Sequence, residues 1–339
     1  MSLDSTLGPV MVDIEGLAVT STEFDRLRHP AAGGIILFRR NYESPEQIID
    51  LVRNIRSVRP DLLIAVDHEG GRVQRFRDGF TRLPPASRYA AENDDALAEK
   101  AGWLMAAELR AIDVDFSFAP VLDVECGISQ VIGDRAFGRD PDTVIRLASA
   151  FVKGMHRAGM AGVGKHFPGH GGVVEDSHLA LPVDQRGVDE LQERDLRPFR
   201  ALLAEGLEGI MPAHVIYERV DPRPAGFCSY WIRQVLRGEL GFTGAVFSDD
   251  LSMAGAAFAG GYVDRARLAL EAGCDMVLVC NAPGAAAEVL DALTDWPADP
   301  QRQSRLERMR GRFPIDRTEL LDSAEWQATS ARLAELSEA

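Results

Sequence analysis

Eight short apolar runs recur along the chain, and the stretches between them carry apolar residues every three or four positions. The runs occupy residues 10–12, 34–38, 62–66, 114–119, 160–164, 209–213, 245–248 and 276–280. Short and continuously apolar runs that alternate with helical stretches are typical of parallel strands buried on both faces. The pattern therefore predicts a buried parallel sheet.

The stretches between these runs carry helix signals. Ser44, Pro45 and Gln47 are a capping residue, a proline at the first helical position and a capping-box partner. Apolar residues then form one stripe at helical spacing from 48 to 55. Further helices are predicted at 95–111, 141–158, 189–206, 229–239, 263–272 and 284–295. We expect Pro198 to break or restart the helix of 189–206.

Eight alternations of strand and helix, with no change of composition, predict a single TIM-type (β/α)8 barrel of the α/β class. A doubly wound open sheet is the alternative, but the first strand is not followed by a GxGxxG motif. We place the barrel at about residues 8–300 and interpret 301–339 as a helical C-terminal extension packed outside it. In this interpretation residues 1–339 form one domain.

Polar residues follow most of the apolar runs, where a barrel enzyme places its chemistry. They are Asp13, Asp67, Asp123, Lys165, His166, His214, Asp249, Asp250 and Asn281. For Asp13, Asp123 and Asn281 a role as helix cap explains the position equally well. Asp250 is more readily interpreted as a cap or a support for its neighbour than as a catalytic group.

Two of the predicted connecting loops are long, at 67–94 and 165–188, and long loops in compact domains are usually functional. The second contains three histidines, His166, His170 and His178. Histidine exchanges protons near neutral pH, so this loop is a candidate for acid–base chemistry.

Composition narrows the classes of partner. The formal charge of −15 and the pI of about 5.0 disfavour binding to nucleic acid or to an anionic membrane. The first residues lack the features of a signal peptide, no apolar run is long enough to span a bilayer, and the four cysteines form no disulfide or metal motif. We expect a cytoplasmic monomer without a cofactor or a metal.

Five motifs together resemble those of family 3 glycoside hydrolases. They are DHEGGRVQR (67–75), IGDR (132–135), KHFPGHG (165–171), DSH (176–178) and FSDDLSM (247–253). Within the family, the chain resembles the single-domain bacterial β-N-acetylglucosaminidases of peptidoglycan recycling. One departure is His68, where the resemblance leads us to expect glutamine.

The resemblance implies a retaining exo-β-N-acetylglucosaminidase that acts on GlcNAc-1,6-anhydroMurNAc peptides. Asp249 would be the nucleophile, His178 the acid/base, and Asp176 the partner of His178. The terminal N-acetylglucosamine would be held by Asp67, Arg75, Arg135, Lys165 and His166.

These residue types suit the chemistry. A carboxylate beneath the anomeric carbon stabilises an oxocarbenium-like transition state, and a histidine can donate and accept the proton of the leaving oxygen. Asp176 lies two residues before His178, so both side chains could point the same way in an extended segment and the carboxylate could orient the imidazole. A neutral or cationic imidazole would also avoid repelling an anionic muropeptide.

Four alternatives remain at the level of sequence. His166, His170, His178, His214 and Asp249 could instead bind zinc in a metal-dependent barrel hydrolase. The chain could be a sugar-binding protein without activity, or phosphate could replace water as the acceptor. The substrate's own acetamide could act as the nucleophile, with Asp249 and Asp250 as the supporting carboxylates.

Overall fold

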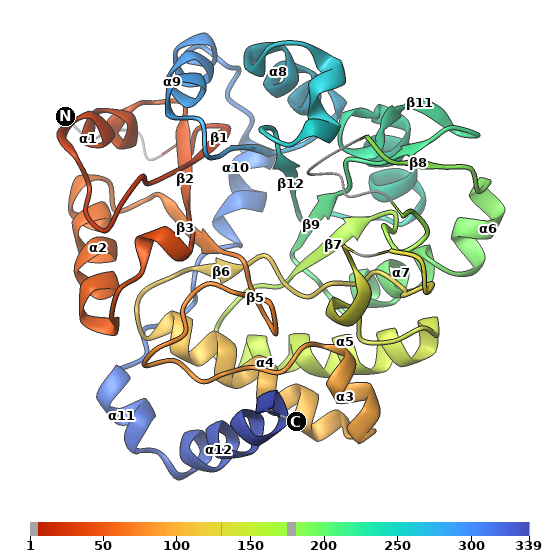
Figure 1. The fold of residues 1–339 in the computed structure, drawn as a ribbon. Coiled ribbons are helices and arrows are strands. Elements are labelled where there is room, and N and C mark those ends of the chain that lie inside the picture. The colour runs from red at the N-terminus through yellow and green to blue at the C-terminus, as the bar shows by residue number, and fades with distance from the viewer. Residues whose placement is uncertain (1–5, 130, 175–180, 339) are drawn as a thin grey trace.

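The computed structural model describes residues 6–129, 131–174 and 181–338. Eight parallel strands form one sheet in the order β6-β3-β2-β1-β13-β12-β9-β7 (Figure 1). Parallel bridges between Phe116 and Ala161 and between Val121 and Lys165 join its two ends. The predicted (β/α)8 barrel is therefore confirmed, and the open-sheet alternative is wrong.

Every barrel strand overlaps one of the eight predicted runs, and the largest shift is that of the strand at 163–167, predicted at 160–164. Their bounds are β1 Val10–Asp13, β2 Ala32–Leu37, β3 Leu63–Val66, β6 Phe116–Ser117, β7 Val163–Phe167, β9 Gly209–Pro212, β12 Ala245–Asp250 and β13 Met276–Val279. Phe116 contacts Phe247 with ring centroids 5.3 Å apart, although β6 and β12 are not neighbours in the sheet. This contact crosses the barrel, whose interior is a packed core.

Helices surround the barrel and lie close to the predicted ranges, except those at 21–28 and 87–92, which were not predicted. They are α1 Ser21–Arg28, α2 Pro45–Val58, α3 Ser87–Glu92, α4 Asp95–Arg110, α5 Pro141–Arg157, α6 Val188–Glu193, α7 Leu196–Ala204, a π-helix at Tyr230–Glu239, α8 Tyr262–Ala272 and α9 Pro283–Ala292. Ser44 caps α2, because its hydroxyl accepts a hydrogen bond from the backbone N–H of Gln47 at 3.2 Å. The 189–206 helix is divided in two, with Pro198 in the first turn of α7.

Two groups of short strands on the connecting loops were not predicted. The first is the hairpin of β4 His68–Gly70 and β5 Val73–Gln74, which follows β3 directly. The second is the small sheet of β8 Val183–Asp184, β10 Ile216–Tyr217 and β11 Asp221–Pro224. Both structure the loops that follow barrel strands.

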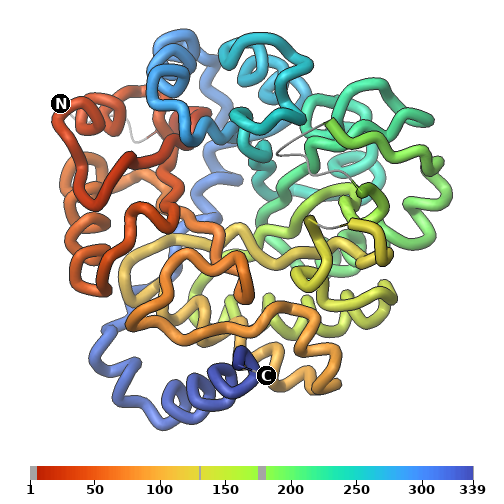
Figure 2. The backbone as a smooth tube through the Cα atoms, in the orientation of Figure 1, coloured from red at the N-terminus to blue at the C-terminus, as the bar shows by residue number. Residues whose placement is uncertain are grey.

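The C-terminal segment packs outside the barrel, as predicted, with helices α10 Pro300–Glu307, α11 Arg317–Asp322 and α12 Ala324–Glu338. Trp326 of α12 donates a hydrogen bond to Glu108 of α4 at 2.9 Å, and Glu108 also accepts one from the Thr81 hydroxyl at 2.6 Å. Figure 2 shows the 67–94 segment running between the barrel and α12. The division into domains stays a prediction. Over the described ranges, helices that combine the length and apolarity needed to cross a membrane are absent.

Candidate active site

A pocket of about 310 Å³ is lined by residues at the carboxyl ends of the strands. Six predicted site residues line it together: Asp67, Arg75, Arg135, Lys165, His166 and Asp249. Asp176 and His178 lie outside the described residues. The polar ends of widely separated strands thus meet at one place, as the barrel geometry requires.

Asp249 lies near the carboxyl end of β12, whose first four residues are fully buried. One carboxylate oxygen of Asp249 accepts a hydrogen bond from the backbone N–H of Asp250 at 2.8 Å. The carboxylate is thus fixed by its own strand while it faces the pocket.

The carboxylate of the next residue, Asp250, is hydrogen-bonded to the chain around it. Asp250 accepts hydrogen bonds from the backbone N–H and the hydroxyl of Ser252, at 2.9 and 2.7 Å, and from the backbone N–H of Cys280 at 3.2 Å. Burial and the negative charge of Asp249 raise the pKa of Asp250 to about 6, against these hydrogen bonds, which lower it. Asp250 therefore caps the turn after β12, in line with the predicted supporting role.

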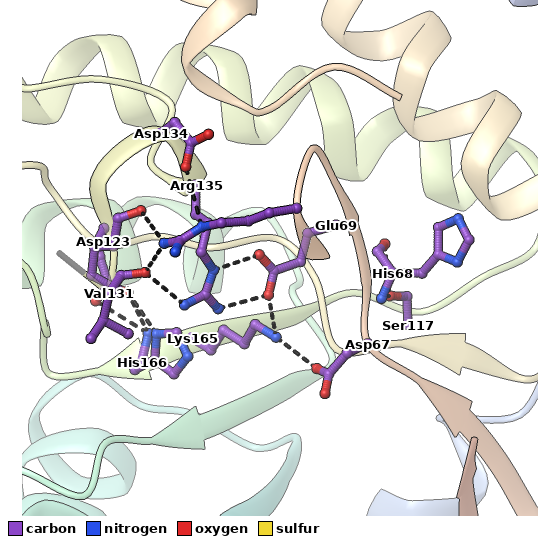
Figure 3. Close-up of polar contacts among 12 residues, drawn as sticks. Asp67, His68, Glu69, Ser117, Asp123, Val131, Asp134, Arg135, Lys165 and His166 are labelled. Carbon is purple, nitrogen blue, oxygen red and sulfur yellow. Dashed lines mark hydrogen bonds and ion pairs between the residues drawn. The ribbon is translucent and has the colours of Figure 1, made fainter. Parts of the chain in front are cut away.

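Five charged side chains, Asp67, Glu69, Arg75, Arg135 and Lys165, form a continuous array on one wall of the pocket. Figure 3 labels all of them except Arg75. The ammonium of Lys165 lies 2.9 Å from Asp67 and 2.6 Å from Glu69. Arg135 donates from Nε and Nη2 to the two oxygens of Glu69, each at 2.8 Å. Arg75 lies 3.6 Å from the second oxygen of Asp67.

The opposite charges of the array favour the ionised forms of Asp67, Glu69 and Lys165. Burial alone would raise the pKa of Asp67 and of Glu69. The positive charges of Lys165 and Arg75 outweigh burial at Asp67, and those of Arg135 and Lys165 outweigh it at Glu69, so both pKa values lie below the usual range. Burial likewise opposes the charge of Lys165, yet Asp67 and Glu69 raise its pKa. A wall of fixed charges and dipoles of this kind binds hydroxyl and amide groups without reorganising.

Glu69 is the member of this array that the sequence analysis missed. It lies at the second position after Asp67 in an extended segment, so both carboxylates point to the same side. Asp176 and His178 have the same two-residue spacing in the sequence, which predicts that their side chains also point the same way. The alternation of side chains along 67–69 is therefore the signal that could have identified it.

His68, between the two carboxylates, points to the opposite side (Figure 3). Its ring is 1% exposed and lies 5.7 Å from the ring of Phe76 and 6.3 Å from that of Phe80. Burial, and secondarily the charge of Arg75, lowers the pKa of His68 to about 3. The departure from the expected glutamine thus falls in the core behind the site.

This burial predicts an acid sensitivity that His68→Gln should remove. The folded state keeps His68 neutral down to a pKa of about 3, whereas an unfolded histidine has a pKa of about 6.5. The stabilisation is present above pH ~6.5 and is lost as the pH falls, by up to ~1.4 kcal/mol per pH unit. Urea unfolding of both proteins between about pH 7 and 5 should show ~2 kcal/mol more loss in the wild type. Equal pH slopes would contradict the assignment.

Asp123 supports the histidines of the 165–188 loop rather than a helix. It is fully buried and accepts hydrogen bonds from Nδ1 of His166 at 2.7 Å and from the backbone N–H of His170 at 2.6 Å. Burial opposes the ionised form, but His166 holds the pKa of Asp123 below its usual value. His166 is therefore oriented toward the pocket by a buried carboxylate.

Three other residues at strand ends have different positions. Asn281 lines the pocket, and its backbone N–H donates to Asp13 at 2.7 Å, which joins the ends of β13 and β1. His214, which follows the predicted run 209–213, is fully buried and is not among the described lining residues. Its Nε2 lies 3.2 Å from the backbone oxygen of Asp250. His214 therefore contacts the backbone of the segment that carries Asp249.

No group of three or more histidine, cysteine, aspartate or glutamate side chains among the described residues is arranged to hold a metal ion.

Comparisons with known proteins show the family of the chain. Residues 6–308 match the family described as glycosyl hydrolase family 3, N-terminal domain. A β-hexosaminidase of Methylococcus capsulatus is 62% identical over 326 residues, which cover 95% of this chain and 98% of the relative. One of Thioalkalivibrio sulfidiphilus is 62% identical over 333 residues, covering 96% and 95%.

The crystal structure of NagZ from Neisseria gonorrhoeae in complex with N-trifluoroacetyl-D-glucosamine has a TM-score of 0.93 and 46% identity. The match covers 98% of this chain and 99% of that one. Fold and sequence therefore agree, and the chain belongs to glycosyl hydrolase family 3.

Proposed function

We propose that this protein is a retaining exo-β-N-acetylglucosaminidase that removes terminal N-acetylglucosamine from GlcNAc-1,6-anhydroMurNAc peptides derived from peptidoglycan. Family membership and relatives at 62% identity make it a β-N-acetylhexosaminidase. The observation that carries the finer proposal is that Asp249 shares one small pocket with the charged array of Asp67, Arg75, Lys165 and Arg135.

The position of Asp249 supports its proposed role as the nucleophile. A retaining glycosidase forms a covalent glycosyl–carboxylate intermediate, and the carboxylate must be held rigidly beneath the anomeric carbon. The rigid placement is supported by two observations: Asp249 is part of β12, and its carboxylate accepts a hydrogen bond from the next backbone N–H. The engagement of Asp250 with Ser252 and Cys280 supports this covalent route over an acetamide-assisted one, which would need a second carboxylate at the sugar.

The array supplies the groups that hold a neutral sugar. Asp67 is the member best placed to accept hydrogen bonds from hydroxyls, because its side chain is 21% exposed whereas that of Glu69 is 8% exposed. Lys165, Arg135, Arg75 and His166 would donate to hydroxyls or to the acetamido oxygen. These assignments complete the binding site of the proposal.

His178 completes the proposed reaction as acid and base. It would give a proton to the departing oxygen and then take one from the attacking water, while Asp176 orients its ring. This assignment rests on the family resemblance, because residues 175–180 lie outside the described part of the chain. We also propose that the protein acts as a monomer in the cytoplasm.

The decisive experiment is a product assay on a GlcNAc-1,6-anhydroMurNAc peptide, with and without phosphate. We expect free N-acetylglucosamine under both conditions and none with Asp249→Ala. N-Acetylglucosamine 1-phosphate as the main product would show phosphorolysis instead. Loss of activity after exhaustive chelation, restored by zinc, would favour the metal-dependent alternative.

A further inference from the structure

We propose that Glu69 is a positioning residue for the sugar site, which directs the donors of Arg135 and Lys165 toward the bound N-acetylglucosamine. The inference rests on the proposed function of the pocket. It adds a residue that acts through its neighbours rather than by contact with the sugar.

Glu69 joins two cations that come from different parts of the barrel. Its Oε1 accepts from Lys165 at 2.6 Å and from Nη2 of Arg135 at 2.8 Å, and its Oε2 accepts from Nε of Arg135 at 2.8 Å. The side chains of Glu69, Lys165 and Arg135 are only 8%, 3% and 10% exposed. Paired charges this deeply buried have little freedom to choose other geometries.

Counting donors shows what Glu69 leaves for a ligand. An ammonium has three N–H groups, and Lys165 uses two of them on Asp67 and Glu69. A guanidinium has five, and Arg135 uses two on Glu69 and a third on the backbone oxygen of Val131 at 3.1 Å. Among the described residues this leaves one donor of Lys165 and two of Arg135, and the bonds to Glu69 fix where they point.

The backbone at Glu69 is held in turn by a glycine–proline contact. Gly70 and Gly71 have φ values of +119° and +54°, in the region that favours glycine. A Cβ on Gly70 would lie 2.5 Å from the backbone oxygen of Pro84, and one on Gly71 would lie 2.8 Å from the Cβ of Pro85. The β4–β5 hairpin therefore lies directly against the 84–85 segment. This contact fixes the backbone from which the side chain of Glu69 extends.

Glu69→Gln should disturb this array without changing its size. The amide NH₂ would replace one acceptor by a donor that faces Arg135 or Lys165, and one buried positive charge would lose its partner. We expect at least ~10-fold weaker binding of N-acetylglucosamine by calorimetry, and a matching rise in KM, because displacements of ~1 Å in such sites have effects up to ~100-fold. The loss in kcat should be smaller than the rise in KM.

A matched control is available at the other end of the barrel. Glu208 precedes β9, is 11% exposed in its side chain, and accepts from His156 and from the backbone N–H of Gly162, each at 3.0 Å. Glu208→Gln removes a similarly buried charge, so it should lower the melting temperature but leave KM unchanged. Glu69→Asp keeps the charge and shortens the side chain; if position matters, it should not restore wild-type KM. It also serves as the test should Glu69→Gln not fold.

A double-mutant cycle separates positioning from a general effect on folding. If Glu69 acts through Lys165, Glu69→Gln should weaken sugar binding less in a Lys165→Met background than alone. Fully additive effects, or a wild-type KM for both Glu69 variants, would overturn the inference while leaving the proposed function intact. A wild-type protein that neither binds N-acetylglucosamine nor hydrolyses its glycosides would overturn both.

Discussion

Asp249→Ala should reduce hydrolysis of an aryl N-acetyl-β-D-glucosaminide by at least ~10⁴-fold, the scale seen when a covalent nucleophile is removed. The reason is local. The side chain lies near the end of a fully buried strand segment and faces the pocket, whereas the adjacent carboxylate of Asp250 is bonded to Ser252 and Cys280. Release of the aryl alcohol, followed by absorbance, measures the effect.

The control for this variant separates chemistry from binding. Asp249→Asn keeps the size of the side chain and an oxygen that can accept from the N–H of Asp250. It should bind N-acetylglucosamine within a few-fold of the wild type while remaining inactive. A fluorinated donor that labels Asp249, detected by peptide mass spectrometry, would support the covalent route. An Asp249→Ala protein with more than about a tenth of the wild-type rate would rule out the assignment.

His178→Ala should produce the second largest effect, and its size should depend on the leaving group. General acid catalysis contributes about 10²- to 10⁴-fold when the departing oxygen needs a proton. A muropeptide or disaccharide has such a leaving group, whereas a nitrophenolate departs without help. Cleavage of the disaccharide should therefore fall far more than the first step on the nitrophenyl glycoside.

This dependence provides its own control. A fold defect or a loss of sugar binding would lower both rates in the same proportion, whereas loss of the acid lowers one selectively. Added azide, which needs no general base, should accelerate turnover of the nitrophenyl substrate by His178→Ala. Equal losses on both substrates, with no effect of azide, would exclude His178 as the acid/base.

The barrel could be predicted because its strands differ sharply from everything around them. Runs such as 34–38 and 276–280 are apolar throughout, since both faces of a parallel strand are covered. The strands of the connecting loops escaped prediction for the opposite reason. The hairpin at 68–74 is short and polar, and it is fixed by contacts with Pro84 and Pro85 rather than by its own pattern.

The site was predictable in location but not in its internal pairing. Once the barrel is assumed, Asp67, Lys165 and Asp249 must meet at the same end. Which carboxylate binds which cation depends on the length and direction of the side chains. These cannot be inferred from the sequence for partners as far apart as Asp67 and Lys165, which are separated by 98 residues. Hence the binding residues could be listed from motifs. The alternation along 67–69 indicates that Glu69 faces the same side as Asp67, but its pairing with both Lys165 and Arg135 is visible only in the structure.

The alternation along residues 67–69 also limits how this segment can change during evolution. Each side chain belongs either to the pocket or to the aromatic core, and the backbone alone decides which. Inserting or deleting one residue here would exchange the two environments, burying carboxylates among phenylalanines and exposing an imidazole to the sugar. Homologous sequences should therefore differ at these positions by substitution, while changes in length accumulate elsewhere in the loop.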